Sequence, residues 1–290
     1  MKPTYLLFSF FFLACFCVWG QTTRIFVSAH QDDWQLFMNP NVFNSIKETE
    51  DTTVIVHTTA GEAGAGMGND AYYLAREKGS LAAIRFLSNT FSSGKGIGQE
   101  MERSTVELNG HNILRYRYRN AVIYLLRLPD GNGDGSGYQI HDFKSLAKFY
   151  HDKVEGLTAI DQSTAYYDKE DLITTLKELI LTEAKSTTEI HLADTDASIN
   201  PNDHSDHQTS SRFFQAAAKE IGGIELVQYI NYATGKLPQN VTGDEFLVCA
   251  GAWGVTTAHI ADHRHYSTWD DVHNNWIGRQ YFRKTLLPKK

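Results

Sequence analysis

Two short clusters of the sequence combine imidazole and carboxylate side chains. They consist of His30, Asp32 and Asp33 and, roughly 170 residues later, of His204, Asp206 and His207. Catalytic zinc takes three ligands of these types and leaves a fourth position for water. The same groups also act as general acids and bases in proton transfer. The composition of the two clusters therefore predicts a metal site with acid–base chemistry, provided that the fold brings them together.

Each cluster follows a segment that we predict to be a buried strand. The segment 25–27 precedes the first cluster, and the segment 189–193 lies shortly before the second. In an open α/β sheet, ligands bind outside the carboxyl ends of the strands, and parallel strands end at the same edge. A single Asp at such a position is often only a helix cap. Two clusters in matched positions favour a shared site instead.

Strand-like and helix-like patterns alternate through most of the chain. Strand patterns cover 25–27, 52–59, 114–128, 189–193 and 224–232, and helical patterns cover 33–46, 72–87, 172–184 and 207–221. Glycine-rich loops follow at 61–66 and 129–137. This alternation predicts an α/β protein with a three-layer, Rossmann-like fold and a mainly parallel sheet. Since no linker or repeat interrupts it, we expect residues 21–290 to form a single domain.

The first twenty residues have a different composition. Lys2 precedes an apolar run rich in Phe and Leu, and residues 18–20 suit a signal peptidase, so we predict a secretory signal cleaved before Gln21. The run is shorter than the ~20 residues that span a bilayer, which disfavours a stable membrane span. A lipoprotein acylated at Cys15 fits less well because Phe12 stands at the outer position. We therefore expect a secreted or periplasmic protein.

Net charge and cysteine content exclude some classes of partner and of covalent cross-link. The net charge of -7 and the absence of a Lys/Arg cluster before the C-terminal pair argue against a nucleic-acid partner. After cleavage Cys249 remains alone, so it cannot form an internal disulfide, and its apolar surroundings favour a buried thiol. Nothing in the sequence determines the oligomeric state.

The clusters also carry a family resemblance. Residues 29–33 (AHQDD) resemble the AHPDD signature of the zinc-dependent N-acetylglucosamine deacetylases, the PIG-L or LmbE-like family, and residues 204–207 (HSDH) resemble its H-x-D-H motif. Residues 59–62 (TAGE), Arg76-Glu77 with Ala82-Ala83, and 128–131 (LPDG) are similar to further family segments. The resemblance covers about residues 24–214. Gln31 and Trp34 depart from it, which puts the substrate more in doubt than the metal.

The resemblance implies a role for each matching residue. His30, Asp33 and His207 would hold Zn²⁺, and Asp32 would be the general base. His204 would polarise the acetamide carbonyl or protonate the leaving amine, and Asp206 would orient an imidazole. Glu62, Arg76 and Asp130 match positions near the sugar. The implied reaction is hydrolysis of the N-acetyl group of an N-acetylglucosamine-type sugar or glycoconjugate, which releases acetate and a free amine.

Other interpretations of the same residues remain open at this stage. Arg76 and Glu77 would also suit a helix-surface ion pair. Residues 130–135 match the first half of a calcium loop, but His141 stands where the loop needs Glu. The protein could be a non-catalytic carbohydrate-binding protein, or a zinc amidohydrolase acting on another small amide.

The aromatic and histidine-rich C-terminal region has two interpretations as well. Trp253, Tyr266, Trp269 and Trp276 would suit a carbohydrate platform, although closing the core is the more ordinary use of such rings. One of the histidines at positions 259, 263, 265 and 273 would border the substrate pocket.

Overall fold

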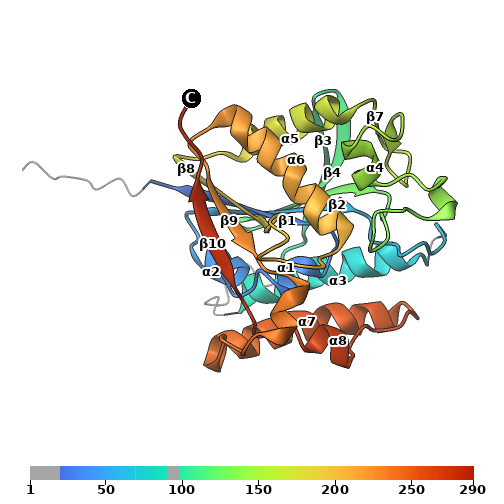
Figure 1. Ribbon diagram of the computed structural model, residues 1–290. Coiled ribbons are helices and arrows are strands. Elements are labelled where there is room, and N and C mark those ends of the chain that lie inside the picture. Colours follow the sequence, from blue (N-terminus) through green and yellow to red (C-terminus); the bar gives the residue numbers. More distant parts are fainter. Residues whose placement is uncertain (1–19, 69, 91–97) are drawn as a thin grey trace, which may run out of the picture.

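An eight-stranded sheet forms the centre of the molecule (Figure 1). The computed structural model describes residues 20–68, 70–90 and 98–290. The strand order is β10-β9-β8-β1-β2-β5-β4-β3. The strands are β1 (Thr22–Ser28), β2 (Thr52–Thr59), β3 (Glu102–Leu108), β4 (His111–Tyr118), β5 (Ala121–Leu128), β8 (Thr187–Ala193), β9 (Glu225–Tyr229) and β10 (Phe282–Leu286). The five strands from β9 to β5 pair in parallel, and β10, β4 and β3 extend the edges antiparallel.

Helices cover both faces of this sheet. One face carries α4 (Leu146–Tyr150), α5 (Lys169–Glu183) and α6 (Ser205–Ile221), and the other carries α1 (Asp33–Leu36), α2 (Asn41–Lys47) and α3 (Tyr72–Asn89) (Figure 1). Below α3 lie α7 (Gly243–Asp262) and the short α8 (Asp271–Asn274). The three-layer α/β fold with a mainly parallel sheet is thus confirmed.

Alternation along the central strands builds a core on each face. Successive side chains of a strand point to opposite faces. Ile25 packs in the core beneath α5 and α6, whereas its neighbour Phe26 packs in the core with α1, α2 and α3. Both side chains are fully buried, which explains why these central strands are continuously apolar.

Several elements differ from the sequence prediction. The helix predicted at 33–46 is two short helices, because Pro40 has no backbone N–H and cannot continue a helix. The stretch 114–128 is an antiparallel hairpin of β4 and β5, which turns at Arg119 and Asn120. The sequence patterns did not predict β3, α7 or β10.

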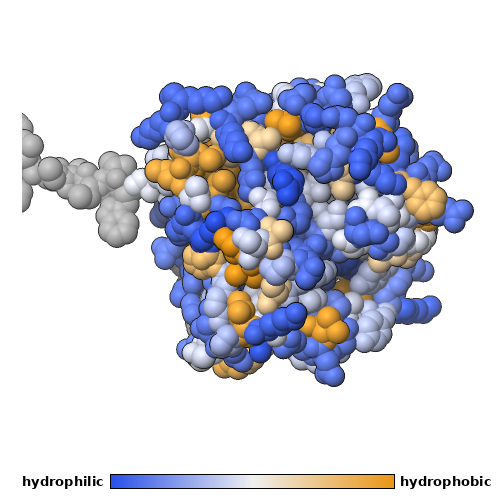
Figure 2. Space-filling view, in the orientation of Figure 1, coloured by the Kyte–Doolittle hydropathy of each residue, from blue (hydrophilic) through white to orange (hydrophobic). Residues whose placement is uncertain are grey.

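The predictions of a signal segment and of no membrane span concern the N-terminal part of the chain and the helices. The signal segment predicted for residues 1–20 falls outside the described ranges except for Gly20. Within the described ranges, no helix is both long and apolar enough to cross a bilayer. Figure 2 shows one face of the molecule, where hydrophilic residues surround separate small hydrophobic patches. Such scattered apolar residues are ordinary on a protein surface.

Candidate metal centre and active site

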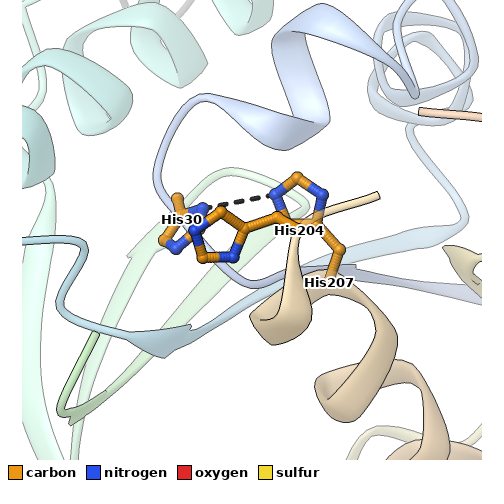
Figure 3. A group of neighbouring side chains, drawn as sticks. All are labelled: His30, His204 and His207. Atoms are coloured by element: carbon orange, nitrogen blue, oxygen red, sulfur yellow. Dashed lines mark hydrogen bonds between the residues drawn. The ribbon is translucent and has the colours of Figure 1, made fainter. Parts of the chain in front are cut away.

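The order of the strands brings the two predicted clusters together. Strands β1 and β8 are parallel neighbours, so the turn after β1 and the loop after β8 leave the same edge of the sheet. His30 lies in the turn after β1, and Asp33 begins α1. His204 caps the N-terminus of α6, which places His207 in its first turn. Figure 3 shows the rings of His30, His204 and His207 gathered at this edge.

Three donor atoms converge on one point of this edge. The Nε2 atom of His207 lies 3.3 Å from His30 Nδ1, the contact dashed in Figure 3. The Oδ1 atom of Asp33 lies 3.0 Å from His207 Nε2 and 3.7 Å from His30 Nδ1. Ligands of a tetrahedral zinc ion, bound at about 2.0–2.2 Å, stand roughly 3.3 Å apart. The triangle that these atoms form therefore fits zinc, with its fourth position left for solvent or substrate.

Carboxylates orient both imidazoles from behind. His30 Nε2 lies 3.3 Å from Asp206 Oδ2, and His207 Nδ1 lies 2.8 Å from Asp203 Oδ1. The side-chain nitrogen of Asn231 is 3.1 Å from the same Nδ1 atom. Such partners fix the tautomer and direction of a metal-binding His. The imidazole that Asp206 contacts is His30. The contact of Asp203 with His207 was not predicted from the sequence, although their spacing of four residues suits neighbours on one helical turn.

The cluster is electrostatically prepared for positive charge. Burial alone would lower the pKa of His30, but hydrogen bonds to Asp206 and Asp33 outweigh it and hold this pKa well above its usual range. Burial acts in the same way on His207, and the charges of Asp33 and Asp203 raise its pKa to about 10. Burial would raise the pKa of Asp33, but the charge of His207 keeps it well below its usual value. Three carboxylates around two imidazoles form a buried site that a cation would stabilise.

His204 plays a different part from the other two histidines. Its Nδ1 accepts a hydrogen bond of 3.1 Å from the backbone N–H of Asp206, so the ring proton must reside on Nε2. Burial, followed by the positive charges of His30 and His207, lowers the pKa of His204 to about 2. The ring lines the pocket as a neutral hydrogen-bond donor.

Arg76 holds the predicted base. Its Nη2 atom donates to Asp32 Oδ1, and its Nη1 atom donates to the carbonyl oxygen of Gly61 at 2.7 Å. Arg76 is buried, and Glu77 pairs instead with Arg127, at 2.7 and 2.6 Å. The alternative of a helix-surface pair between Arg76 and Glu77 is therefore wrong, and Arg76 orients Asp32 at the wall of the pocket.

Asp130 lies at the surface of the pocket, and Glu62 lies behind it. Asp130 lines the pocket, with Oδ2 3.9 Å from His30 Nε2. Glu62 is fully buried behind it, where it accepts from the backbone N–H of Asp130 at 3.1 Å and lies 2.8 Å from His141 Nε2. Glu62 therefore supports Asp130 and does not line the pocket.

The loop 130–137 does not arrange its carboxylates around a calcium ion. Asp130 Oδ2 accepts from the backbone N–H of Ala63 at 3.2 Å, and Asp134 Oδ1 accepts from that of Ser136 at 2.9 Å. Among the described residues, every cluster with metal-binding geometry includes His30, and none includes Asp134. The glycine-rich loop serves the candidate active site instead: its Gly131 N–H donates to Asp206 Oδ2 at 2.9 Å.

His30, Asp33 and His204 line a small cavity, whereas His207 lies behind its surface. This pocket has a volume of about 230 Å³. Its walls come from the segments that follow β1, β5 and β8, from α3 and from the C-terminal segment; they include Tyr72, Tyr138, Tyr232, Thr268, His273 and Trp276. A larger cavity of about 780 Å³ lies between α3 and α7, but its lining residues include none of the clustered donors. The smaller pocket is therefore the candidate active site, because it contains the clustered imidazoles and carboxylates.

Known structures resemble the fold only distantly. No protein-family model and no curated protein matches the sequence. An N,N'-diacetylchitobiose deacetylase from Pyrococcus horikoshii shares 12% identity at a TM-score of 0.46, over 92% of this chain and 84% of that one. A deacetylase solved with teicoplanin shares 13% at 0.46, over 91% and 97%. The 4-carboxy-2-hydroxymuconate hydratase from Pseudomonas putida KT2440 shares 11% at 0.41, over 88% and 83%. Likeness at this level bears on neither activity nor substrate.

Proposed function

We propose that this protein is a secreted, zinc-dependent N-deacetylase that hydrolyses the N-acetyl group of an N-acetylglucosamine-type sugar or glycoconjugate. The observation that carries the proposal is the triangle of His30 Nδ1, Asp33 Oδ1 and His207 Nε2, with separations of 3.0 to 3.7 Å. Asp32 and His204 flank this triangle at the wall of the same pocket. Ligands, base and hydrogen-bond donor together suit amide hydrolysis.

The donor set suits zinc on chemical grounds. Two imidazole nitrogens and one carboxylate oxygen are a usual ligand set for catalytic zinc. His30 Nδ1 and His207 Nε2 lie 3.3 Å apart, a separation that suits two nitrogen ligands of one tetrahedral ion. When bound there, Zn²⁺ supplies Lewis acidity that activates water for attack and polarises a carbonyl.

The protein's own residues would divide the remaining work. Asp32, held by Arg76, accepts a proton from the attacking water and passes it to the departing nitrogen. His204 donates its Nε2 hydrogen to the acetamide oxygen, where negative charge develops as water adds to the carbon. The C–N bond then breaks, and acetate and a free amine leave the pocket. The fixed Nδ1 hydrogen bond favours this polarising role of His204 over protonation of the amine.

Acetate release from N-acetylglucosamine and its conjugates tests the proposal. We expect release by the purified mature protein, loss of release after chelation, and recovery when Zn²⁺ is returned. Asp32→Ala should retain zinc but lower turnover by about 10²- to 10⁴-fold, the usual contribution of a general base. Asp134→Ala, which changes an exposed carboxylate of the neighbouring loop, is the matched control and should keep activity. Full turnover in Asp32→Ala would contradict the mechanism.

A further inference from the structure

The side chain of Gln31 joins the turn after β1 to the chain that follows β2. Gln31 stands between His30 and Asp32 in the sequence, and its side chain is buried. Its Nε2 atom donates to the carbonyl oxygen of Ala60 at 2.9 Å and lies 3.4 Å from that of Thr59. Because β2 ends at Thr59, the buried carbonyl group of Ala60 lies beyond the strand ladder, and Gln31 supplies its donor.

Arg76 supplies the donor for the next carbonyl group along the chain. Its Nη1 atom donates to the carbonyl oxygen of Gly61 at 2.7 Å, and its Nη2 atom donates to Asp32 Oδ1. A Cβ atom added to Gly61 would lie 2.7 Å from Arg76 Nη1 and 2.9 Å from Gln31 Oε1. Gly61 is therefore packed between the guanidinium group of Arg76 and the amide group of Gln31.

These contacts form a closed ring. It runs from Gln31 through the backbone of residues 60–61 to Arg76, then to Asp32, and back along the chain to Gln31. Every member of the ring is buried, and a buried carbonyl group without a donor is unfavourable. Without the Gln31 contact, the backbone of residues 60–61 would turn toward another donor. Since Arg76 is held by Gly61, that shift would also move the guanidinium group that orients Asp32.

Packing alone does not explain an amide at position 31. Among the described residues, Gln31 Oε1 has no hydrogen-bond partner, and burial of an unpaired polar atom costs free energy. A methionine would fill a similar space without this cost. The residues that line the pocket do not include Gln31, so its side chain acts on the site through its neighbours. The donor on Nε2 is therefore what the amide contributes.

We propose that Gln31 is a positioning residue, which holds Arg76 and thereby keeps Asp32 in the orientation that accepts a proton from the attacking water. The inference rests on the proposed function and adds a residue to its machinery. The AHPDD signature has Pro at this position, and a Pro side chain cannot donate a hydrogen bond. The departure at Gln31 therefore concerns the general base rather than the substrate.

Replacing Gln31 with Met removes the donor but keeps a side chain of similar length. Gln31→Met should retain about one zinc ion per chain and a KM for N-acetylglucosamine within about twofold of the parent. Its kcat for acetate release should fall by about 10- to 100-fold, because a misplaced catalytic group slows the chemical step. A parental kcat, or a fall that accompanies loss of zinc, would overturn the inference.

Gln35→Met is the matched control. Gln35 is as buried as Gln31, but its Nε2 atom donates to the backbone carbonyl oxygen of Gln31 at 3.1 Å and not to residues 59–61. The same substitution at this position should therefore change kcat by less than about twofold. An equal fall of kcat in both variants would show a general effect of losing a buried amide, and the inference would be wrong.

Coupling with Arg76 separates positioning from a merely structural contribution. Arg76→Lys keeps the positive charge but loses the forked guanidinium group, so it should lower kcat by itself. If Gln31 acts through Arg76, adding Gln31→Met to Arg76→Lys should lower kcat by no more than about two- to threefold further. A further fall of about tenfold or more would mean that Gln31 acts by another route, and would overturn the inference.

Crystal structures decide the matter if the parent protein releases no acetate. That result rejects the proposed function but leaves the ring of contacts to be tested. In Gln31→Met, a guanidinium group of Arg76 that no longer contacts both Gly61 and Asp32 supports the positioning role. A guanidinium group that keeps both contacts rejects it.

Discussion

At the scale of single residues, the second partner of each imidazole decides how well the site can hold a metal. His207 points Nε2 into the cluster because its Nδ1 donates to Asp203 Oδ1 at 2.8 Å on the other side of the ring, beside Asn231. His30 is held in the same way by Asp206. A description of the candidate site therefore has to include the carboxylates that orient the two imidazoles.

Asp203 provides a direct prediction. Replacing Asp203 with Asn keeps the size of the side chain but removes the charge that orients His207, so the zinc affinity of the apoprotein should fall by about tenfold or more. Competition with a chromophoric chelator measures this affinity. Asp196→Asn changes a half-exposed carboxylate of the same loop and should leave the affinity unchanged. Equal affinities of parent and Asp203→Asn, with both proteins folded, would refute the role of Asp203.

A second residue, Glu189, predicts a pH-dependent contribution to stability. Its hydrogen bond with His191 and the charge of Arg24 outweigh burial and lower its pKa to about 2, and Arg24 Nε lies 3.1 Å from Glu189 Oε2. Because the folded pKa lies below the unfolded one of about 4.3, the carboxylate stabilises the fold above that pH and loses this effect as the pH falls toward 2. Glu189→Gln should cost about 1 kcal/mol at pH 7, after allowance for solvent screening.

Urea unfolding at pH 7, 5 and 3.5 measures this difference. The cost of Glu189→Gln should be constant between pH 7 and 5 and smaller at pH 3.5, while the exposed control Glu50→Gln should have little effect throughout. A cost that does not change with pH would show that the carboxylate charge is not responsible.

At the scale of elements, the sequence pattern predicted correctly those strands whose own residues favour a strand. The strand predicted at 52–59 is β2. The predicted strands before His30 and His204 are β1 and β8. The sequence patterns did not predict elements that depend on contacts with distant parts of the chain. Helix α7 contains Gly251, Gly254 and β-branched residues, all weak helix formers, and its packing against α3 compensates for them.

The contact between α3 and α7 provides a paired prediction. A Cβ atom added to Gly79 in α3 would lie 2.8 Å from the carbonyl oxygen of Thr256 in α7, so Gly79→Ala must push the two helices apart. We expect a loss of about 1–3 kcal/mol in the free energy of unfolding, despite the better helix propensity of Ala. Gly254→Ala in α7 meets nothing closer than 3.8 Å and should be neutral or slightly stabilising. Denaturant unfolding of both variants checks this, and equal stabilities would contradict the close helix contact.

At the scale of the whole molecule, the strand order creates the site. His30 and Asp33 follow β1 while His207 follows β8, and the parallel pairing of these strands makes all three neighbours. Matched strand ends in the sequence were enough to predict this meeting. They were not enough to predict the C-terminal wall of the pocket, because Thr268, His273 and Trp276 reach it through α7, whose helical packing the sequence did not reveal.

Zinc content measured by plasma mass spectrometry after dialysis tests the central claim most directly. The parent protein and the control His151→Ala, which changes an exposed His away from the pocket, should each retain about one zinc ion per chain. His30→Ala and His207→Ala should retain almost none, because each removes one of the three converging donors. Undiminished zinc in both of these variants, or none in the parent, would contradict the assignment of one metal to the two clusters.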